Sequence, residues 1–294
     1  MYGSIMSSLK PMSRSFVKPV SIERKSVKMQ QKNYTKEQLK EQLREMGIEP
    51  TDALMVHSSM KSLGAVEGGA DTVIDALMEA VSRGLLMMPT HTWKCMGPAH
   101  NLFDPKKEPC CVGIIPELFR KRPGVVRSLH PTHSIAVYGA MAEEYVKGEE
   151  TAGTPCPPGG CWDRLRDIHA KILLVGVTHA RNTFIHSIEE VFDVPERFSE
   201  TPIAYRIKMP DGTEKSVQVY KHYNPYMEHI SESFDKMKQG YYDTGAARKA
   251  YLGDAECILC DAEKMFEVTG RILTRYPNCF IECDIIPREW YLGE

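Results

Sequence analysis

A strand, a loop, a helix and a second strand follow one another between residues 53 and 91 of the 294-residue chain. The two strands, Ala53–Val56 and Leu85–Met88, are short continuous apolar runs, and apolar residues recur at helical spacing through 71–82. Strands of this kind are buried on both faces, as in a parallel sheet with helical crossovers. This unit therefore restricts the chain to an α/β architecture.

The rest of the chain repeats this alternation. The clearest apolar strand, 171–177, precedes a helix expected over 183–192. An Asp-Gly turn at 211–212 between strands 203–208 and 216–221 indicates a β-hairpin. We therefore expect one main core with a small antiparallel appendage in the C-terminal third. Further helices are expected at 34–47, 114–121, 140–146, 163–166 and 261–275, and a further strand at 134–138.

Charge divides the chain into two parts. Residues 1–33 hold seven Lys or Arg and one acidic residue, a net +6, whereas 30 basic and 38 acidic residues leave −8 in residues 34–294. The first part is rich in Ser, Lys and Met without periodicity, so we predict a flexible basic leader at 1–33 and a single domain over 34–294. An acidic domain does not suit nucleic acid, but it suits a cationic small molecule.

Apolar runs and cysteines indicate in which cellular compartment the protein resides. No apolar run approaches the roughly 18 residues of a membrane-spanning helix, so no membrane partner is expected. The first 30 residues lack the apolar segment of a secretory signal, which favours a cytoplasmic protein with reduced thiols. Nine cysteines include one CxxC, Cys257 and Cys260, without a second matching pair. A zinc site needs about four ligands in register, so we interpret the cysteines as free thiols.

The strongest candidate for chemistry follows the clearest strand. In the sequence GVTHARNTFIHSIEE, the side chain of Asn182 or Thr183 is predicted to cap a helix, which places His186 in or near the first turn. Ligands of open α/β sheets bind beyond the carboxyl ends of strands. The positive helix end favours a neutral imidazole, as a general base requires. Either Glu189 or Glu190 is spaced to contact the ring.

A second candidate is the loop after the first strand. It carries His57, Ser58, Ser59, Lys61 and Ser62 and leads into a helix. Hydroxyls, a cation and backbone amides suit a phosphate or pyrophosphate. The alternative is an ordinary serine-rich loop, since neither GxxxxGK[ST] nor GxGxxG is present.

More polar residues are expected at the same sheet edge. Thr90 and His91 follow the second strand, and His130, His133 and Ser134 precede the strand at 134–138. The three histidines could bind a metal together with a carboxylate. However, HxH and HExxH spacing are absent, so no metal is expected.

These segments together resemble the aminoglycoside 3-N-acetyltransferase family, an antibiotic acetyltransferase group distinct from the common GNAT acetyltransferases. The matching pieces occur in the family's order across roughly residues 36–275: VHSSMKSLGAVEGGADTVIDAL, LMMPTHTW, FDPKKEP, GIIPELFRKRPGVVRSLHPTHSIAVYG, ILLVGVTHARNTFIHSIEE and GDAECILCDAEKMF. The resemblance implies a three-layer α/β/α fold with a central mixed sheet. It also implies N-acetyl transfer from acetyl-CoA to a primary amine, as in aminoglycoside resistance, by direct transfer within a ternary complex.

The resemblance further implies roles for individual residues. His186 matches the catalytic histidine of the family's TxxHxxE motif, with Thr183 and Glu189 as its other members. Ser58, Ser59, Ser62 and Thr90 match positions that line the family's coenzyme A groove. From their expected place at the same sheet edge we assign four more residues to this groove: His57, Lys61, His91 and Ser134.

Two departures from the family's pattern concern the acceptor side. The segment CPPGGCWDRL stands where aminoglycoside-modifying members usually have SPL. Those members also tend to carry a catalytic carboxylate further along the chain, where this chain reads VYKHYNPYMEH. His222 lies in that neighbourhood, with Glu228 a little beyond, so we expect His222 to join the catalytic group. The acceptor is then an aminoglycoside-like or other small amine.

Two other functions stay open from the sequence. One is a coenzyme A-binding protein that lacks catalysis, suggested by the altered segment 219–229. The other is a metal-dependent hydrolase that uses the histidine cluster. The partners expected are acetyl-CoA, a small amine and a second copy of the chain in a homodimer.

Overall fold

Three apolar strands form the centre of a seven-stranded mixed sheet in the computed structural model, which describes residues 33–292. They are β2 (Ala53–Ser58), β4 (Leu85–Pro89) and β8 (Lys171–Val175). β2 runs parallel to both neighbours, as the sequence predicts. The sheet order is β11 (Ala247–Leu252), β12 (Ala255–Asp261), β8, β2, β4, β7 (Ile135–Tyr138) and β6 (Val126–Arg127).

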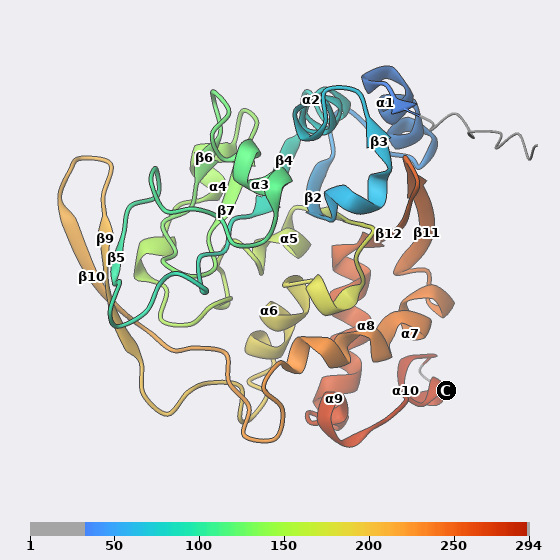
Figure 1. Ribbon diagram of the computed structural model, residues 1–294. Coiled ribbons are helices and arrows are strands. Elements are labelled where there is room, and N and C mark those ends of the chain that lie inside the picture. The colour runs from blue at the N-terminus through green and yellow to red at the C-terminus, as the bar shows by residue number, and fades with distance from the viewer. Residues whose placement is uncertain (1–32, 293–294) are drawn as a thin grey trace, which may run out of the picture. The chain divides into compact units, whose positions relative to one another are not determined.

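Helices cover both faces of this sheet, which gives the expected three layers (Figure 1). Side chains alternate along each strand, so Leu173 and Val175 face one core while Ile172 and Leu174 face the other. The first core is closed by α1 (Lys36–Glu45), α2 (Ala70–Ala80) and α3 (Ile114–Phe119). The second is closed chiefly by α5 (Arg164–Asp167), α6 (Phe184–Val191) and α8 (Ala262–Arg275).

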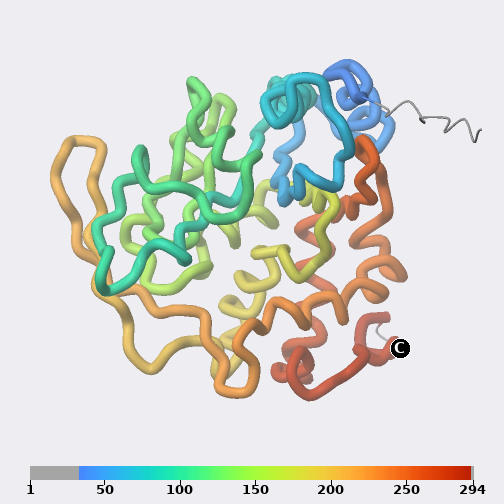
Figure 2. Tube along the Cα trace, viewed as in Figure 1, coloured from blue at the N-terminus to red at the C-terminus, as the bar shows by residue number. Residues whose placement is uncertain are grey.

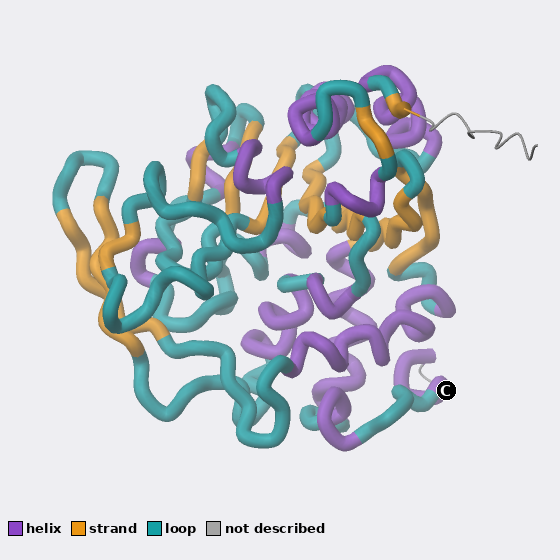
Figure 3. Tube along the Cα trace, viewed as in Figure 1, coloured by secondary structure: helices purple, strands orange, loops and turns teal. Residues whose placement is uncertain are grey.

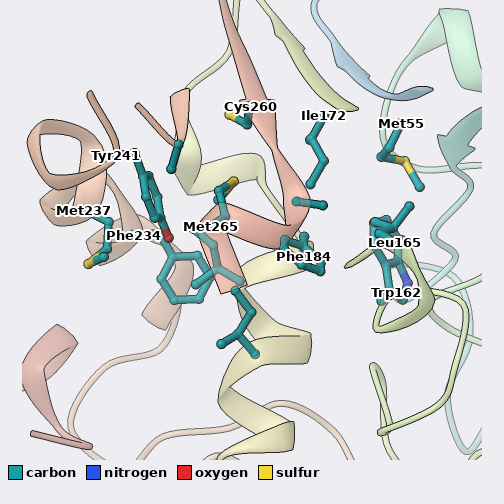
Figure 4. Close-up of a cluster of buried hydrophobic side chains, with 14 of the residues drawn as sticks. Met55, Trp162, Leu165, Ile172, Phe184, Phe234, Met237, Tyr241, Cys260 and Met265 are labelled. Carbon is teal, nitrogen blue, oxygen red and sulfur yellow. The ribbon is translucent and has the colours of Figure 1, made fainter. Parts of the chain in front are cut away.

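The second core carries the large aromatic side chains that hold α6 in place. Phe184 on α6 and Met265 on α8 pack there near Ile172 of β8, in the middle of the cluster. Trp162 lies at one end of it (Figure 4). All four side chains are buried. Because burying each of them is worth roughly 1.5–3 kcal/mol or more, α6 is fixed on the sheet by packing rather than by helix propensity.

The predicted hairpin forms the core of a separate three-stranded sheet. β9 (Ile203–Lys208) and β10 (Glu214–Val219) are antiparallel, as expected. A third strand, β5 (Leu102–Phe103), pairs with β9 in parallel, so the appendage is mixed rather than purely antiparallel. The sequence missed β5 because two residues within a long Pro- and Gly-containing loop show no strand periodicity.

The C-terminal part contains structure that the sequence analysis did not anticipate. β11 and β12 form an antiparallel hairpin that extends the main sheet beyond β8. The segment 222–250, expected only as polar, holds η4 (Ile230–Met237) and α7 (Lys238–Asp243). The remaining short elements are β1 (Asn33–Tyr34), η1 (Met60–Leu63), β3 (Ala65–Val66), α4 (Ala142–Tyr145), η2 (Glu149–Thr151), η3 (His179–Arg181), α9 (Cys279–Glu282) and α10 (Arg288–Leu292).

The first described segment is joined to the β11–β12 hairpin at one side of the sheet, where α1 lies beside β11 (Figure 2). The Tyr34 hydroxyl donates to Asp254 Oδ1 at 2.6 Å, and the Gly253 N–H donates to Gln42 Oε1 at 2.8 Å. The predicted leader at 1–33 lies outside the described residues except for Asn33. Among the described helices, none combines the length and apolar character needed to cross a membrane.

Candidate active site

The carboxyl ends of the three parallel strands open into one cavity of about 640 Å³. His57 and Ser58 end β2, Pro89 and His91 lie at the end of β4, and Val177 follows β8. Most of the other lining residues belong to loops and turns, the segments drawn in teal in Figure 3. The cavity thus lies where ligand sites are expected in an open α/β sheet.

Histidines dominate the titratable side chains of the described cavity wall. Glu228 is the single carboxylate among these lining residues, whereas Lys94, Arg181 and Lys221 supply positive charge. The acidic surplus of the domain is therefore not gathered in the cavity lining. The lining histidines are His57, His91, His133, His186, His222 and His229.

A glycine turn carries the chain from β8 toward His186. Gly176 has φ of +61°, and a Cβ there would lie 2.2 Å from Ser62 Cβ. Only glycine fits such a close approach at positive φ. The short helix η3 follows, and α6 begins at Phe184, which places His186 in its first turn as predicted.

The predicted side-chain cap of α6 is wrong. Thr183 has helical backbone angles, φ −60° and ψ −22°, and its side chain makes no cap hydrogen bond. Because its backbone is already helical, the hydroxyl is not placed to accept from the next turn. Thr183 Oγ1 instead lies 3.2 Å from His91 Nε2 and joins α6 to the end of β4. Asn182 donates to Met265 Sδ rather than capping the helix.

His186 is held by a buried carboxylate. Its Nδ1 lies 3.2 Å from Glu189 Oε2, and the other oxygen of Glu189 accepts from Arg197 Nε at 2.6 Å. The Glu189 and Arg197 side chains are 1% and 2% exposed. Burial alone would raise the pKa of Glu189, but contacts with His186 and Arg197 outweigh it and hold that pKa below its ordinary value. Glu189 is therefore ionised, and it leaves His186 Nε2 as the nitrogen available to a substrate.

A second glutamate–histidine pair lies against the first. His222 Nε2 is 2.8 Å from Glu190 Oε1, and the His222 ring stacks on His186 with centroids 4.1 Å apart. Glu190 also accepts from the Cys156 N–H at 2.8 Å and from the Thr154 hydroxyl. Burial raises the pKa of Glu190 to about 7. Burial, and then the charge of His186, hold the pKa of His222 well below its ordinary value.

The residues assigned to the coenzyme A groove fall into three groups. His57, Ser58 and His91 line the cavity. Ser59 and Ser62 hydroxyls lie 3.1 Å apart at η1, where Ser62 lines a smaller adjoining pocket beside Gly176. The remaining assigned residues, Lys61, Thr90 and Ser134, are not among the residues that line the large cavity.

Thr90 and Ser134 instead belong to a buried network around Arg127. Arg127 Nε donates to the Thr90 and Ser134 hydroxyls at 3.2 and 3.1 Å, and its other nitrogens donate to backbone carbonyls, including Glu108 O. Burial lowers the pKa of Arg127 to about 10, so it remains charged at pH 7. The two hydroxyls therefore bond to Arg127 and to each other rather than to the cavity.

The three histidines considered for a metal lie close together, with the ring of His133 4.7 Å from that of His91 and 5.9 Å from that of His130, but His130 has no nitrogen free for a metal. Both nitrogens of His130 are engaged by the backbone, Nε2 with Thr154 O and Nδ1 with the N–H groups of Thr132 and His133. Within residues 33–292, the one group with metal-binding geometry is Cys156, Glu190 and His222.

The interpretation of the cysteines as free thiols is confirmed. All nine are free, and the CxxC pair Cys257 and Cys260 is buried on β12. Successive positions of a strand face opposite sides, so these two thiols, three residues apart, point to opposite faces. They therefore do not form a chelating pair.

Sequence reasoning missed three residues of the site. Arg197 lies in the loop after α6, and nothing in its sequence context marks it as a partner of Glu189. Trp162, from the CPPGGCWDRL departure, stacks on His91 with centroids 5.5 Å apart and donates to His133 O. Tyr205, on β9 of the appendage, also lines the cavity.

Comparisons place the chain among known proteins. A family described as aminoglycoside 3-N-acetyltransferase matches residues 55–274. Aminoglycoside N(3)-acetyltransferase III from a Salmonella species is 28% identical over 257 residues, 78% of this chain and 88% of the relative.

Solved structures show the same fold. A crystal structure of aminoglycoside acetyltransferase AAC(3)-IVa, a histidine-to-alanine mutant in complex with gentamicin, matches with a TM-score of 0.74 at 26% identity, covering 86% of this chain and 93% of that one. AAC-IIIb in a binary complex with CoASH matches in fold with a TM-score of 0.70 at 22% identity, covering 81% and 96%.

The fold and these matches define an N-acetyltransferase. The chain belongs to the aminoglycoside 3-N-acetyltransferase family. The family, the three-layer fold with its mixed sheet and the enzyme class predicted from the sequence are therefore confirmed.

Proposed function

We propose that this enzyme acetylates a primary amine of an aminoglycoside or a similar small acceptor, with His186 as the general base. The observation that carries the proposal is the carboxylate-backed imidazole of His186 at the wall of the strand-edge cavity. The names of relatives and the gentamicin complex of AAC(3)-IVa support an aminoglycoside acceptor.

The proposed chemistry uses each nitrogen of the imidazole differently. Glu189 holds Nδ1, which fixes the ring and stabilises the imidazolium that forms, while Nε2 takes a proton from the attacking amine. Thr183 supports the site through His91, and His222 belongs to the same catalytic group. The amine attacks the thioester carbon directly, so no protein nucleophile is required.

Unpartnered polar atoms support the placement of acetyl-CoA in the cavity. Within the described chain, His57 Nε2, Ser58 Oγ and His91 Nδ1 are buried without a hydrogen-bond partner. Burial lowers the pKa of His57 to about 3, so its imidazole is neutral at pH 7. Buried polar groups normally have partners, and a bound substrate would supply them. We assign Ser59, Lys61 and Ser62 to the adjacent rim of this groove, and Thr90 and Ser134 to its support.

Ser58→Ala is expected to raise KM for acetyl-CoA about 3- to 10-fold with little change in kcat, which corresponds to one neutral hydrogen bond. Steady-state kinetics with varied acetyl-CoA measure it. Ser216→Ala on the appendage strand β10 is the matched control. An unchanged KM for Ser58→Ala would remove Ser58 from the groove.

A thiol-release assay with acetyl-CoA and a panel of aminoglycosides, amino sugars and simple amines tests the function itself. Steady turnover on any amine excludes a coenzyme A-binding protein without catalysis. Coenzyme A binding with no turnover on the whole panel would favour that alternative instead. Stoichiometric zinc or iron in active protein would support a metal-dependent enzyme.

Deletion of residues 1–28 is expected to leave kcat/KM and the melting temperature unchanged. The described contacts begin at β1, whose pairing with β3 the deletion spares. The family match also begins later, at residue 55. A large loss of activity in the shortened protein would show that the leader takes part in catalysis.

We further propose a cytoplasmic location, which the nine free thiols support. The homodimer stays a prediction that light scattering of the purified protein tests.

A further inference from the structure

Two adjacent glutamates of α6 have different electrostatic surroundings. Glu189 has a buried arginine as its partner, whereas the one ion-pair partner of Glu190 within the described residues is His222. Contacts with His186 and Arg197 lower the pKa of Glu189 and keep it ionised, while buried Glu190 has a pKa of about 7 and can exist as a neutral acid. Two carboxyls whose environments separate their pKa values in this way often divide acid–base roles between them.

The histidines that these glutamates hold are in direct contact. The rings of His186 and His222 stack at an interplanar angle of 26° with centroids 4.1 Å apart, and both line the cavity. Two imidazolium ions at this distance repel each other, so the stack accommodates one positive charge at a time. A proton that arrives on His222 must therefore move on before His186 is protonated. The 2.8 Å hydrogen bond to Glu190 provides that route.

The reaction with an ammonium acceptor requires two proton removals. A primary alkyl amine with a pKa near the lysine value of about 10.4 is protonated at pH 7 and has no lone pair for attack. One proton must leave before the nitrogen can attack, and the second must leave as the amide forms. A single general base would have to release the first proton to solvent before it could take the second.

We propose that Glu190 and His222 form a second base, which takes the first proton from the acceptor ammonium before His186 acts. This role rests on the proposed function. The first proton moves from the ammonium nitrogen to Nδ1 of His222 as the proton on Nε2 passes to the Glu190 carboxylate, so no free imidazolium has to form. Once the product has left, this proton returns to solvent through His222, which lines the cavity. The neutral amine forms its bond to the thioester carbon, and His186 takes the second proton. The carbon–sulfur bond breaks with its electron pair on sulfur, which takes the proton from His186. The products are the acetylated amine, coenzyme A thiol and one proton in solution.

The surroundings of the pair are consistent with this transfer. Arg197 and Glu189 offset each other, so neither leaves a net charge next to the pair. His130 is engaged by the backbone through both nitrogens, and burial raises the pKa of the Cys156 thiol, which keeps it neutral. The titratable or charged groups that face the pair are His130, His133, Cys156, His186, Glu189 and Arg197.

The same side chains also have the geometry of a metal site. The donor atoms of Cys156, Glu190 and His222 lie within 4.8 Å of one another. However, both oxygens of Glu190 are already satisfied by Thr154, the Cys156 N–H and His222. These hydrogen bonds therefore account for the arrangement of the three side chains without a metal. Chelation and Zn²⁺ addition distinguish a proton path from a metal site.

The test compares Glu190→Gln, His222→Asn and His186→Ala between pH 7 and pH 9.5. The acceptor is the panel amine that the wild type acetylates fastest. At pH 7 we expect Glu190→Gln and His222→Asn to be about 10- to 100-fold slower than the wild type, as for loss of a positioned base. At pH 9.5 the fraction of an amine with a pKa near 10.4 that is already neutral is roughly 300-fold larger than at pH 7, so their deficit should shrink severalfold. The His186→Ala deficit should stay large at both values.

His169→Asn is the matched control, because His169 forms the same kind of pair with Glu263, at 2.7 Å, on the surface. It should keep wild-type rates. His222→Asn leaves the buried carboxylate in place, so it reports even if Glu190→Gln folds poorly.

Three results would overturn the second base. They are wild-type rates at pH 7 in both pair variants, a deficit of equal size at both pH values, or activity that a chelator abolishes and Zn²⁺ restores. Wild-type turnover by His186→Ala would instead contradict the proposed function, so the two failures are distinguishable.

Discussion

His186→Ala is expected to lower kcat by about 10²- to 10⁴-fold, the range for removal of a positioned general base. The imidazole is the group that Glu189 orients toward the cavity, and no other side chain of the described site occupies its place. Coenzyme A binding should survive, because the polar atoms assigned to it come from β2 and β4. The thiol-release assay measures kcat, and calorimetry measures coenzyme A binding.

A second substitution separates lost chemistry from lost packing. The His186 ring contacts Phe234, with centroids 4.7 Å apart, as well as His222, so alanine also leaves a void. His186→Gln fills much of this space and cannot act as a base. If His186 acts by proton transfer, His186→Ala and His186→Gln should be equally slow. Turnover near the wild-type rate in His186→Gln would show that the ring acts by packing alone.

Arg197→Met is expected to lower the free energy of unfolding by about 3–5 kcal/mol, because it leaves the Glu189 carboxylate buried without its cation. The two side chains are 2% and 1% exposed and join at 2.6 Å. The stabilisation that this ion pair provides depends on pH. Because the pKa of folded Glu189 lies below its ordinary value, the stabilisation is present at neutral pH and is lost as the pH falls toward the folded pKa. Urea unfolding at pH 7 measures the difference.

Two controls make this loss specific to the buried pair. Arg197→Met combined with Glu189→Met removes both charges, and we expect it to recover most of the stability. Arg206→Met breaks an exposed pair with Glu214, 3.0 Å long with side chains 50% and 44% exposed. It should change the unfolding free energy by less than about 1 kcal/mol. An Arg197→Met protein as stable as the wild type would mean that Glu189 is protonated or hydrated.

The part of the site on one continuous segment was predictable. An apolar strand, a glycine turn and a helix start set the distance from Val175 to His186, and helical spacing placed Glu189 beside the ring. The helix cap was wrong because the backbone angles at Thr183 decide where its hydroxyl reaches. The roles of Thr90 and Ser134 were not foreseeable, since Arg127 reaches them from another strand.

By itself, the sequence determined the layers, the parallel strands and the position of His186, because the apolar repeat within an element dictates which face it buries. Only the tertiary structure decided which glutamate serves which histidine. Helical spacing left Glu189 and Glu190 equivalent, and their difference comes from Arg197 and His222, which two separate loops bring to α6. Charge partners depend on where the chain returns in space, and no local periodicity encodes that path.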